Sequence, residues 1–331
     1  MGSSLVFKEP VVVGAGVIGP QIAQSWAQAG YRVKLVDIAD EILKRAVSNI
    51  RSNLEGLAEA EVIDFEEVET VLSRIIPTTD LEASVKNSDF ILEAIPESLE
   101  LKRGLFQRLD KISLPEAILA RNASTIPITA MAEATERPER VIGYHVIAPP
   151  YITLPVEVIP GAKTSAKTLE ATKAFVRSIG KIPIVCKDIP GKIINRIQFA
   201  MTNEAIKLLE QGAATAEDID LACRLSFGLR LPIMGPLRSN DLAATLKTTL
   251  LGLEYLYKAT GEDTFRPTEL LKKKVEAGEL GPWSGKGWYS YEGVDVKALL
   301  KERDRVLIEM VKFLKERGLL PTTKKVGSRP H

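Results

Sequence analysis

The segment VVVGAGVIGPQIAQSWAQAGYRVKLVD, residues 11–37, constrains the fold of this chain more than any other part of the sequence. Its glycines Gly14, Gly16 and Gly19 follow an apolar β-type run and precede an amphipathic helical pattern. In this spacing the first glycine permits a tight turn, the second lets the backbone approach a pyrophosphate, and the third allows close packing of helix on strand. The segment therefore predicts a strand, a turn and a helix that together bind a dinucleotide.

The same segment indicates which dinucleotide is bound. The helix N-terminus offers unpaired N–H groups to an anion, so we expect Gly16, Val17, Ile18 and Gly19 to contact the pyrophosphate. Asp37 ends the following β-type run. A carboxylate there accepts hydrogen bonds from both ribose hydroxyls and repels a 2′-phosphate, so we expect NAD rather than NADP.

The hydrophobic pattern divides the chain into two parts. Up to Asp188, β-type runs alternate with helical patterns, which predicts a parallel sheet covered by helices. The segment KDIPGK combines Pro and Gly and is typical of a boundary. We therefore predict an α/β Rossmann-type domain over 1–188, followed by an all-α domain over 189–331. The β-type runs lie at 11–13, 32–37, 90–94, 118–120, 141–145, 156–159 and 182–186, and the later helical patterns at 192–210, 216–225, 241–260 and 306–317.

Composition excludes several classes of function. The formal net charge of +1 gives no basic surface for nucleic acid or membrane. Cys186 and Cys223 have neither the spacing of a metal site nor that of a disulfide framework. No apolar run reaches the length of about 18 residues that a membrane span needs. We expect a cytoplasmic protein that acts on a small-molecule substrate, with no metal, no nucleic acid and no membrane partner.

Histidine is rare in this chain, which contains only His145 and the C-terminal His331. His145 ends a β-type run, at the edge where open α/β sheets bind ligands. Glu157 lies on the next run, where a turn through 148–150 brings it beside the imidazole. Such a carboxylate fixes the tautomer of a histidine that removes a hydroxyl proton during hydride transfer. The alternatives are a structural imidazole and a solvated glutamate.

These residues resemble those of the 3-hydroxyacyl-CoA dehydrogenases, and the resemblance covers nearly the whole chain. It implies a Rossmann domain, a helical dimerisation domain, NAD as cofactor and oxidation of the 3-hydroxyl of an L-3-hydroxyacyl-CoA. The helices after Asp188 are also rich in Leu, Ile and Met, so we predict a homodimer formed through 190–300. The shared motifs are VVVGAGVIG at 11–19, LEAIPESLELKRGLF at 92–106, RNASTIPIT at 121–129, DIPGKIINRI at 188–197, IMGPLRSNDL at 233–242 and GPWSGKGWYSYEG at 281–293.

The resemblance also implies a role for individual residues. It makes His145 the general base and Glu157 its partner. It implies that Ser124 and Asn195 hydrogen-bond the substrate oxygen or orient the base. It places Glu97, Lys102 and Asn122 on the cofactor side of the site.

Departures from the family pattern concern the substrate more than the chemistry. Ala148 and Pro149 stand where the family usually has Asn-Pro, and Lys192 follows Gly191 where many members have Phe. The stretch EGLAEAEVIDFEEVET at 55–70 is acidic, whereas acyl-CoA enzymes often carry lysines there to meet the CoA phosphates. Three interpretations stay open: a short-chain substrate such as 3-hydroxybutyryl-CoA, a free 3-hydroxy acid of the L-gulonate or carnitine type, and a non-catalytic NAD-binding protein.

Overall fold

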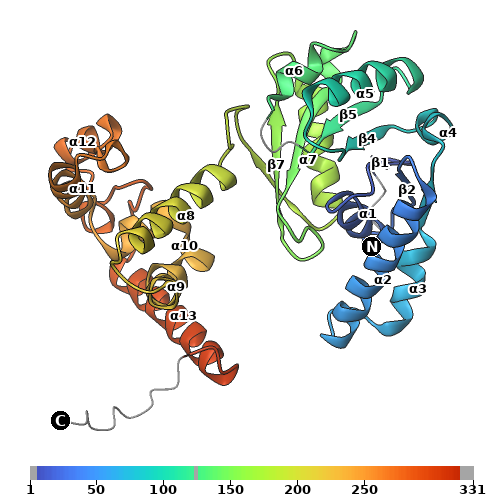
Figure 1. The fold of residues 1–331 in the computed structure, drawn as a ribbon. Coiled ribbons are helices and arrows are strands. Elements are labelled where there is room, and N and C mark those ends of the chain that lie inside the picture. Colours follow the sequence, from blue (N-terminus) through green and yellow to red (C-terminus); the bar gives the residue numbers. More distant parts are fainter. Residues whose placement is uncertain (1–5, 123–125, 321–331) are drawn as a thin grey trace. The chain divides into compact units, whose positions relative to one another are not determined.

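The computed structural model describes residues 6–122 and 126–320, and the chain divides into two compact units, Met1–Thr202 and Asn203–His331. The first unit contains an eight-stranded sheet with helices on both faces (Figure 1). The strands are β1 (Val11–Val13), β2 (Val33–Val36), β3 (Ile75–Thr78), β4 (Phe90–Glu93), β5 (Ile118–Arg121), β6 (Val141–Val146), β7 (Pro155–Pro160) and β8 (Ile182–Val185).

The strand order is β3-β2-β1-β4-β5-β6-β7-β8, and neighbouring strands are parallel except for β6 and β7. The order places β1 between β2 and β4, which is the point where open α/β sheets bind a ligand beyond the carboxyl ends of the strands. The predicted Rossmann-type architecture is confirmed.

Alternate strand residues supply two apolar cores, one on each face of the sheet. Val12 belongs to the core that α1, α2 and α7 cover, whereas Val11 and Val13 belong to the core under α5 and α6. This alternation explains why the run of three valines is entirely buried. The helices of this unit are α1 (Gly19–Gln28), α2 (Asp40–Glu59), α3 (Phe65–Ser73), α4 (Leu81–Val85), α5 (Leu99–Ile112), α6 (Ile128–Ala132) and α7 (Ala166–Ser178).

The predicted parallel sheet contains one antiparallel pair, at the turn expected through 148–150. β6 and β7 are antiparallel because the connection at 147–154 is too short for a parallel crossover, which needs a dozen or more residues. The strand β3 was not predicted, because Pro77 interrupts its β-type run.

The second unit is built of helices, as predicted. The helix predicted over 241–260 is two helices, since α10 ends at Ala243 and Thr245 caps the next helix by accepting a hydrogen bond from Thr248 N. The last helix begins ten residues before its predicted start because Asp295 caps it. The helices are α8 (Ile194–Glu210), which runs across the division between the units, α9 (Ala216–Leu225), α10 (Phe227–Ala243), α11 (Leu246–Thr260), α12 (Glu269–Glu276) and α13 (Val296–Glu316).

Two further observations bear on the sequence predictions. Within the described residues, no helix combines the length and the apolar character needed to cross a membrane. The division of the chain into two units falls within α8 rather than at Asp188, and the domain boundary at 188 stays a prediction.

Candidate active site

His145 and Glu157 face each other directly across the β6–β7 pair. Nδ1 of His145 lies 2.6 Å from Oε2 of Glu157, and both side chains are buried. With Nδ1 at the carboxylate, Nε2 is the ring nitrogen that can exchange a proton with another group. Because the carboxylate accepts from the Nδ1 proton, it selects the tautomer in which Nε2 can take up a proton.

The second oxygen of Glu157 is held from another element. Oε1 accepts hydrogen bonds from Ile193 N at 2.9 Å and from Ile194 N at 3.0 Å, where α8 begins. Burial opposes ionisation of this carboxyl, but the hydrogen bonds from His145 and from the two backbone N–H groups outweigh it and hold the pKa of Glu157 below its usual value. Glu157 is therefore an oriented, ionised carboxylate at neutral pH.

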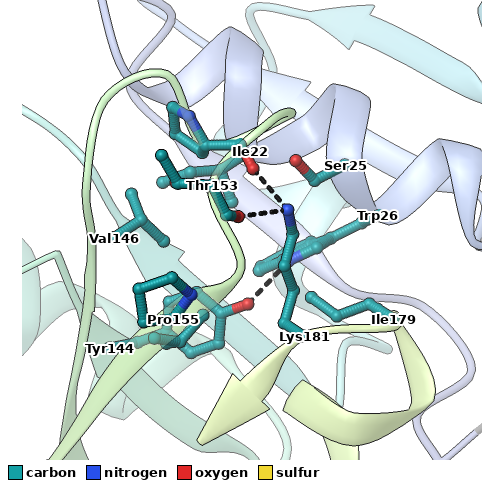
Figure 2. A pocket seen from close by; sticks show the side chains of 11 residues that line it. Ile22, Ser25, Trp26, Tyr144, Val146, Thr153, Pro155, Ile179 and Lys181 are labelled. Carbon is teal, nitrogen blue, oxygen red and sulfur yellow. Dashed lines mark hydrogen bonds between the residues drawn. The ribbon is translucent and has the colours of Figure 1, made fainter. Parts of the chain in front are cut away.

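Lys181 holds the loop that joins β6 and β7 through two backbone carbonyl groups. Its Nζ lies 2.6 Å from both Pro150 O and Thr153 O, and burial lowers the pKa of the amine. Figure 2 shows Lys181 beside Trp26, whose Nε1 donates to the hydroxyl of Tyr144 at 3.1 Å. The cavity between these side chains measures ≈ 10 Å³, room for about one water, so it supports the loop and holds no substrate.

The glycine turn after β1 has the geometry that a dinucleotide requires. Gly14 has φ +112°, and a Cβ there would lie 2.5 Å from Ala94 O. A Cβ on Gly19 would lie 1.8 Å from Gly14 O, so helix and turn contact each other directly. A Cβ on Gly16 would meet nothing within 4 Å, which leaves open space above this residue. That space fits a pyrophosphate approaching the backbone near Val17 and Ile18.

Asp37 lies beside the glycine turn. Its Oδ2 accepts from Ala15 N at 2.6 Å and its Oδ1 from Ile38 N at 2.7 Å. The side chains of Val17 and Ile38 are almost fully exposed, although both are apolar. The carboxylate of Asp37 therefore lies between the glycine turn, which it contacts at Ala15, and the exposed Ile38. Ile38 was not predicted as a site residue, and its only sequence signal is its place directly after Asp37.

Asn122, which follows β5, bonds to residues of both β4 and β6. Its backbone N–H donates to Glu93 O at 2.9 Å, and its Oδ1 accepts from Val146 N at 3.4 Å. Val146 directly follows His145 in β6, so Asn122 lies at the end of β5 next to the histidine.

Glu97 and Lys102 belong to a buried ionic cluster beside Asn122. Nζ of Lys102 lies 2.8 Å from Glu93 Oε1 and 2.9 Å from Glu97 Oε2. Glu93 and Arg121 complete the cluster and were not predicted. Both end apolar strands, FILE and ILAR, and a charged residue in that place is the signal that could have found them. Burial raises the pKa of Glu93 above its usual value despite Lys102.

Ser124 and Asn195 are the two remaining predicted residues. Ser124 lies outside the described residues. Asn195 is half-buried in the first turn of α8, directly after Ile194, which bonds Glu157. The structure thus brings His145, Glu157, Asn122 and Asn195 to one region of the sheet edge, through contacts that link β5, β6, β7 and the start of α8.

The acidic stretch at 55–70 lies on α2 and α3 and faces solvent. Its carboxylates are all exposed, and Glu69 alone among them pairs with a described cation, Arg51. The basic residues that would meet CoA phosphates are absent from this stretch of sequence. The exposed carboxylates are Glu55, Glu59, Glu61, Asp64, Glu66, Glu67 and Glu69.

Comparison with known proteins gives two family matches and several relatives. Residues 10–189 match the family model of the 3-hydroxyacyl-CoA dehydrogenase NAD binding domain, and residues 191–291 match that of the 3-hydroxyacyl-CoA dehydrogenase C-terminal domain. A probable 3-hydroxybutyryl-CoA dehydrogenase of Deinococcus radiodurans is 42% identical over 280 residues, which cover 85% of this chain and 99% of that protein.

A second relative and a solved structure cover more of the chain. The 5-formyl-3-hydroxy-2-methylpyridine 4-carboxylate 5-dehydrogenase of Mesorhizobium japonicum is 31% identical over 316 residues, 92% of this chain and 98% of that protein. The crystal structure of a 3-hydroxyacyl-CoA dehydrogenase from Archaeoglobus fulgidus aligns with a TM-score of 0.76 at 31% identity, covering 93% of this chain and 99% of that one.

Proposed function

The chain belongs to the 3-hydroxyacyl-CoA dehydrogenase family, an NAD-dependent oxidoreductase family, and we propose that it oxidises short-chain L-3-hydroxyacyl-CoA esters with His145 as the general base. The observation that carries the proposal is the buried His145–Glu157 pair at the sheet edge that also holds the glycine turn. The motif resemblance is confirmed by the family match, and NAD is the family's cofactor.

The site residues divide the reaction between them. NAD, when bound, supplies the carbon that accepts the hydride. Nε2 of His145 receives the hydroxyl proton as the hydride leaves the carbon that bears this hydroxyl group. Glu157 keeps its charge throughout and stabilises the imidazolium that forms. We further propose that Asn195, together with Ser124, holds the oxygen that changes from hydroxyl to ketone.

The cofactor side is assigned by the same reasoning. The open space over Gly16 admits the pyrophosphate to the N–H groups at the start of α1, whose N-cap Ile18 makes no side-chain cap bond. Asp37 would accept hydrogen bonds from the ribose hydroxyls beside its bond from Ala15 N. Glu97, Lys102 and Asn122 lie on the nicotinamide side in this proposal.

We also propose that the protein is a cytoplasmic homodimer. Large apolar side chains of α8 are exposed, among them Ile197, Phe199 and Met201, and a second copy covering them would bury that surface. Cys186 and Cys223 are free thiols, as expected in a reducing compartment. A monomeric mass at micromolar concentration would contradict the dimer.

A free 3-hydroxy acid is a second candidate substrate, favoured by one observation. The exposed carboxylates at 55–69 disfavour the several phosphate charges of CoA more than the single charge of a small acid. The Mesorhizobium relative, which carries a carboxylate in the name of its substrate, covers more of this chain than the Deinococcus relative does.

NADH formation separates these functions. The purified protein is incubated with NAD and, in parallel, with L-3-hydroxybutyryl-CoA, L-gulonate and carnitine. The proposal predicts the largest kcat/KM with the CoA ester. A larger value with a free acid would establish the second candidate, and no NADH with any 3-hydroxy compound would leave a non-catalytic NAD-binding protein.

A further inference from the structure

Arg121 is a buried arginine in a position where its guanidinium reaches several groups at once. It is the last residue of β5 and is 0% exposed. Its Nη2 donates to Glu97 Oε1 at 2.7 Å, its Nη1 donates to Ile126 O, and its Nε lies 3.6 Å from Glu93 Oε2. A buried charge needs such partners, because an unpaired one is strongly destabilising.

The Arg121–Glu97 ion pair also bonds the backbone N–H and carbonyl groups of Ile126. Ile126 donates its N–H to Oε1 of Glu97 at 3.2 Å, and its carbonyl accepts from Arg121. Arg121 and Glu97 therefore hold the backbone at Ile126 from both sides of its peptide groups. Lysine could replace the charge of Arg121, but its single ammonium lacks the planar fork that donates in two fixed directions.

The side chain of Glu97 is more exposed to solvent than the two cations with which it pairs. Its side chain is 36% exposed, whereas those of Arg121 and Lys102 are 0% and 2% exposed. Each of its oxygens accepts from one cation, Oε1 from Arg121 and Oε2 from Lys102. The carboxylate is thus held rigidly from the protein interior while part of it stays accessible to a ligand.

We propose that Arg121 is a positioning residue for NAD, which acts by holding the carboxylate of Glu97 and the backbone of Ile126 at the cofactor side of the site. This inference rests on the proposed role of Glu97 in binding the cofactor. Arg121 itself does not contact the cofactor, because it is fully buried. Preorganisation of this kind lowers the ordering cost of binding, so its loss weakens NAD affinity rather than the chemical step.

Arg137 supplies a matched control within the same chain. Its Nε donates to Asp110 Oδ1 at 2.6 Å and its Nη2 to Asp110 O at 2.7 Å, so it also joins a carboxylate to backbone carbonyl oxygens. It lies among α5, η1 (Pro138–Arg140) and their connections, with no described contact to Glu97 or Asn122. Replacing Arg137 should therefore lower stability through the loss of similar hydrogen bonds, while the contacts of Glu97 and Asn122 stay unchanged.

The test compares Arg121→Lys with Arg137→Lys. NADH dissociation constants are measured by fluorescence titration, and kcat and KM for NAD by steady-state kinetics with the best substrate found for the wild type. We expect Arg121→Lys to raise the dissociation constant on the order of tenfold, the effect of losing a hydrogen bond to a charged group. Its kcat at saturating NAD should stay near wild type, and Arg137→Lys should bind NADH normally.

Two results would overturn the inference while the proposed function stands. One is an NADH dissociation constant for Arg121→Lys equal to that of Arg137→Lys. The other is a loss confined to kcat. Failure of wild-type protein to bind NADH would instead contradict the proposed function itself. If Arg121→Lys does not yield folded protein, Arg121→Gln against Arg137→Gln gives the same comparison.

Discussion

The carboxylate of Glu157 joins the imidazole of His145 to the start of α8: one oxygen lies 2.6 Å from Nδ1 of His145, and the other accepts from Ile193 N and Ile194 N. A single side chain therefore sets both the tautomer of the histidine and the position of the backbone that leads into Asn195. A change to Glu157 should therefore lower the rate of proton transfer more than it lowers the affinity for the cofactor.

Glu157→Gln should lower turnover and shift its pH dependence. A carboxylate accepts at both oxygens, whereas a carboxamide accepts at one, so the variant cannot serve His145 and the two backbone N–H groups together. Loss of the negative charge also disfavours the imidazolium. We expect the acid-side midpoint of the kcat/KM profile to move to lower pH. An unchanged midpoint would contradict the electrostatic role of Glu157.

The lowered pKa of Glu157 also predicts a pH-dependent contribution to stability. Because the folded-state value lies below the unfolded one, this contribution is fully present above the unfolded pKa of about 4.3 and is lost as the pH falls through the folded value. The difference in Tm between wild type and Glu157→Gln should therefore be larger at pH 7 than at pH 4. A constant difference across this range would contradict the prediction.

Asp37→Ala should weaken NAD far more than NADP. The substitution removes the acceptor for the ribose hydroxyls and also the charge that repels a 2′-phosphate. The measurement is the ratio of kcat/KM values for the two cofactors. An unchanged ratio would show that Asp37 does not select the cofactor, despite its position beside Ala15 N.

Gly16→Ala and Gly14→Ala should separate cofactor binding from folding. A Cβ on Gly16 meets no protein atom within 4 Å, so the variant should keep the wild-type Tm and lose NADH affinity as the methyl group occupies the pyrophosphate's space. Gly14 has φ +112° and a Cβ would lie 2.5 Å from Ala94 O, so Gly14→Ala should lower the Tm. Equal NADH affinity in wild type and Gly16→Ala would place the pyrophosphate elsewhere.

The sequence predicted those features that local patterns determine. Glycine spacing located the turn after β1, and the alternation of apolar runs located most strands, because these signals involve neighbours along the chain. The turn expected through 148–150, which brings Glu157 beside His145, corresponds to the antiparallel pairing of β6 and β7. The sequence pattern joined the end of α10 and the whole of α11 into one helix, since the cap at Thr245 resembles an ordinary polar helix position.

For the buried ionic cluster the sequence offers a signal, a charged residue at the end of an apolar strand, but does not say whether that residue is buried. Glu97 and Lys102 were predicted from a family resemblance, but Arg121 was not, because its partners lie in different elements and meet only in the folded sheet. A charge at the end of an apolar strand is usually solvated. Only the contacts with Glu97 and with Ile126 O show that Arg121 is buried and bonded.

The most direct test of the central claim is the turnover and NADH affinity of His145→Gln. If His145 is the general base, kcat should fall on the order of 10²–10⁴-fold while the NADH dissociation constant stays near wild type, since no proposed cofactor contact depends on the imidazole. Near wild-type turnover, or a loss of NADH binding that accounts for the fall in activity, would contradict the proposed mechanism.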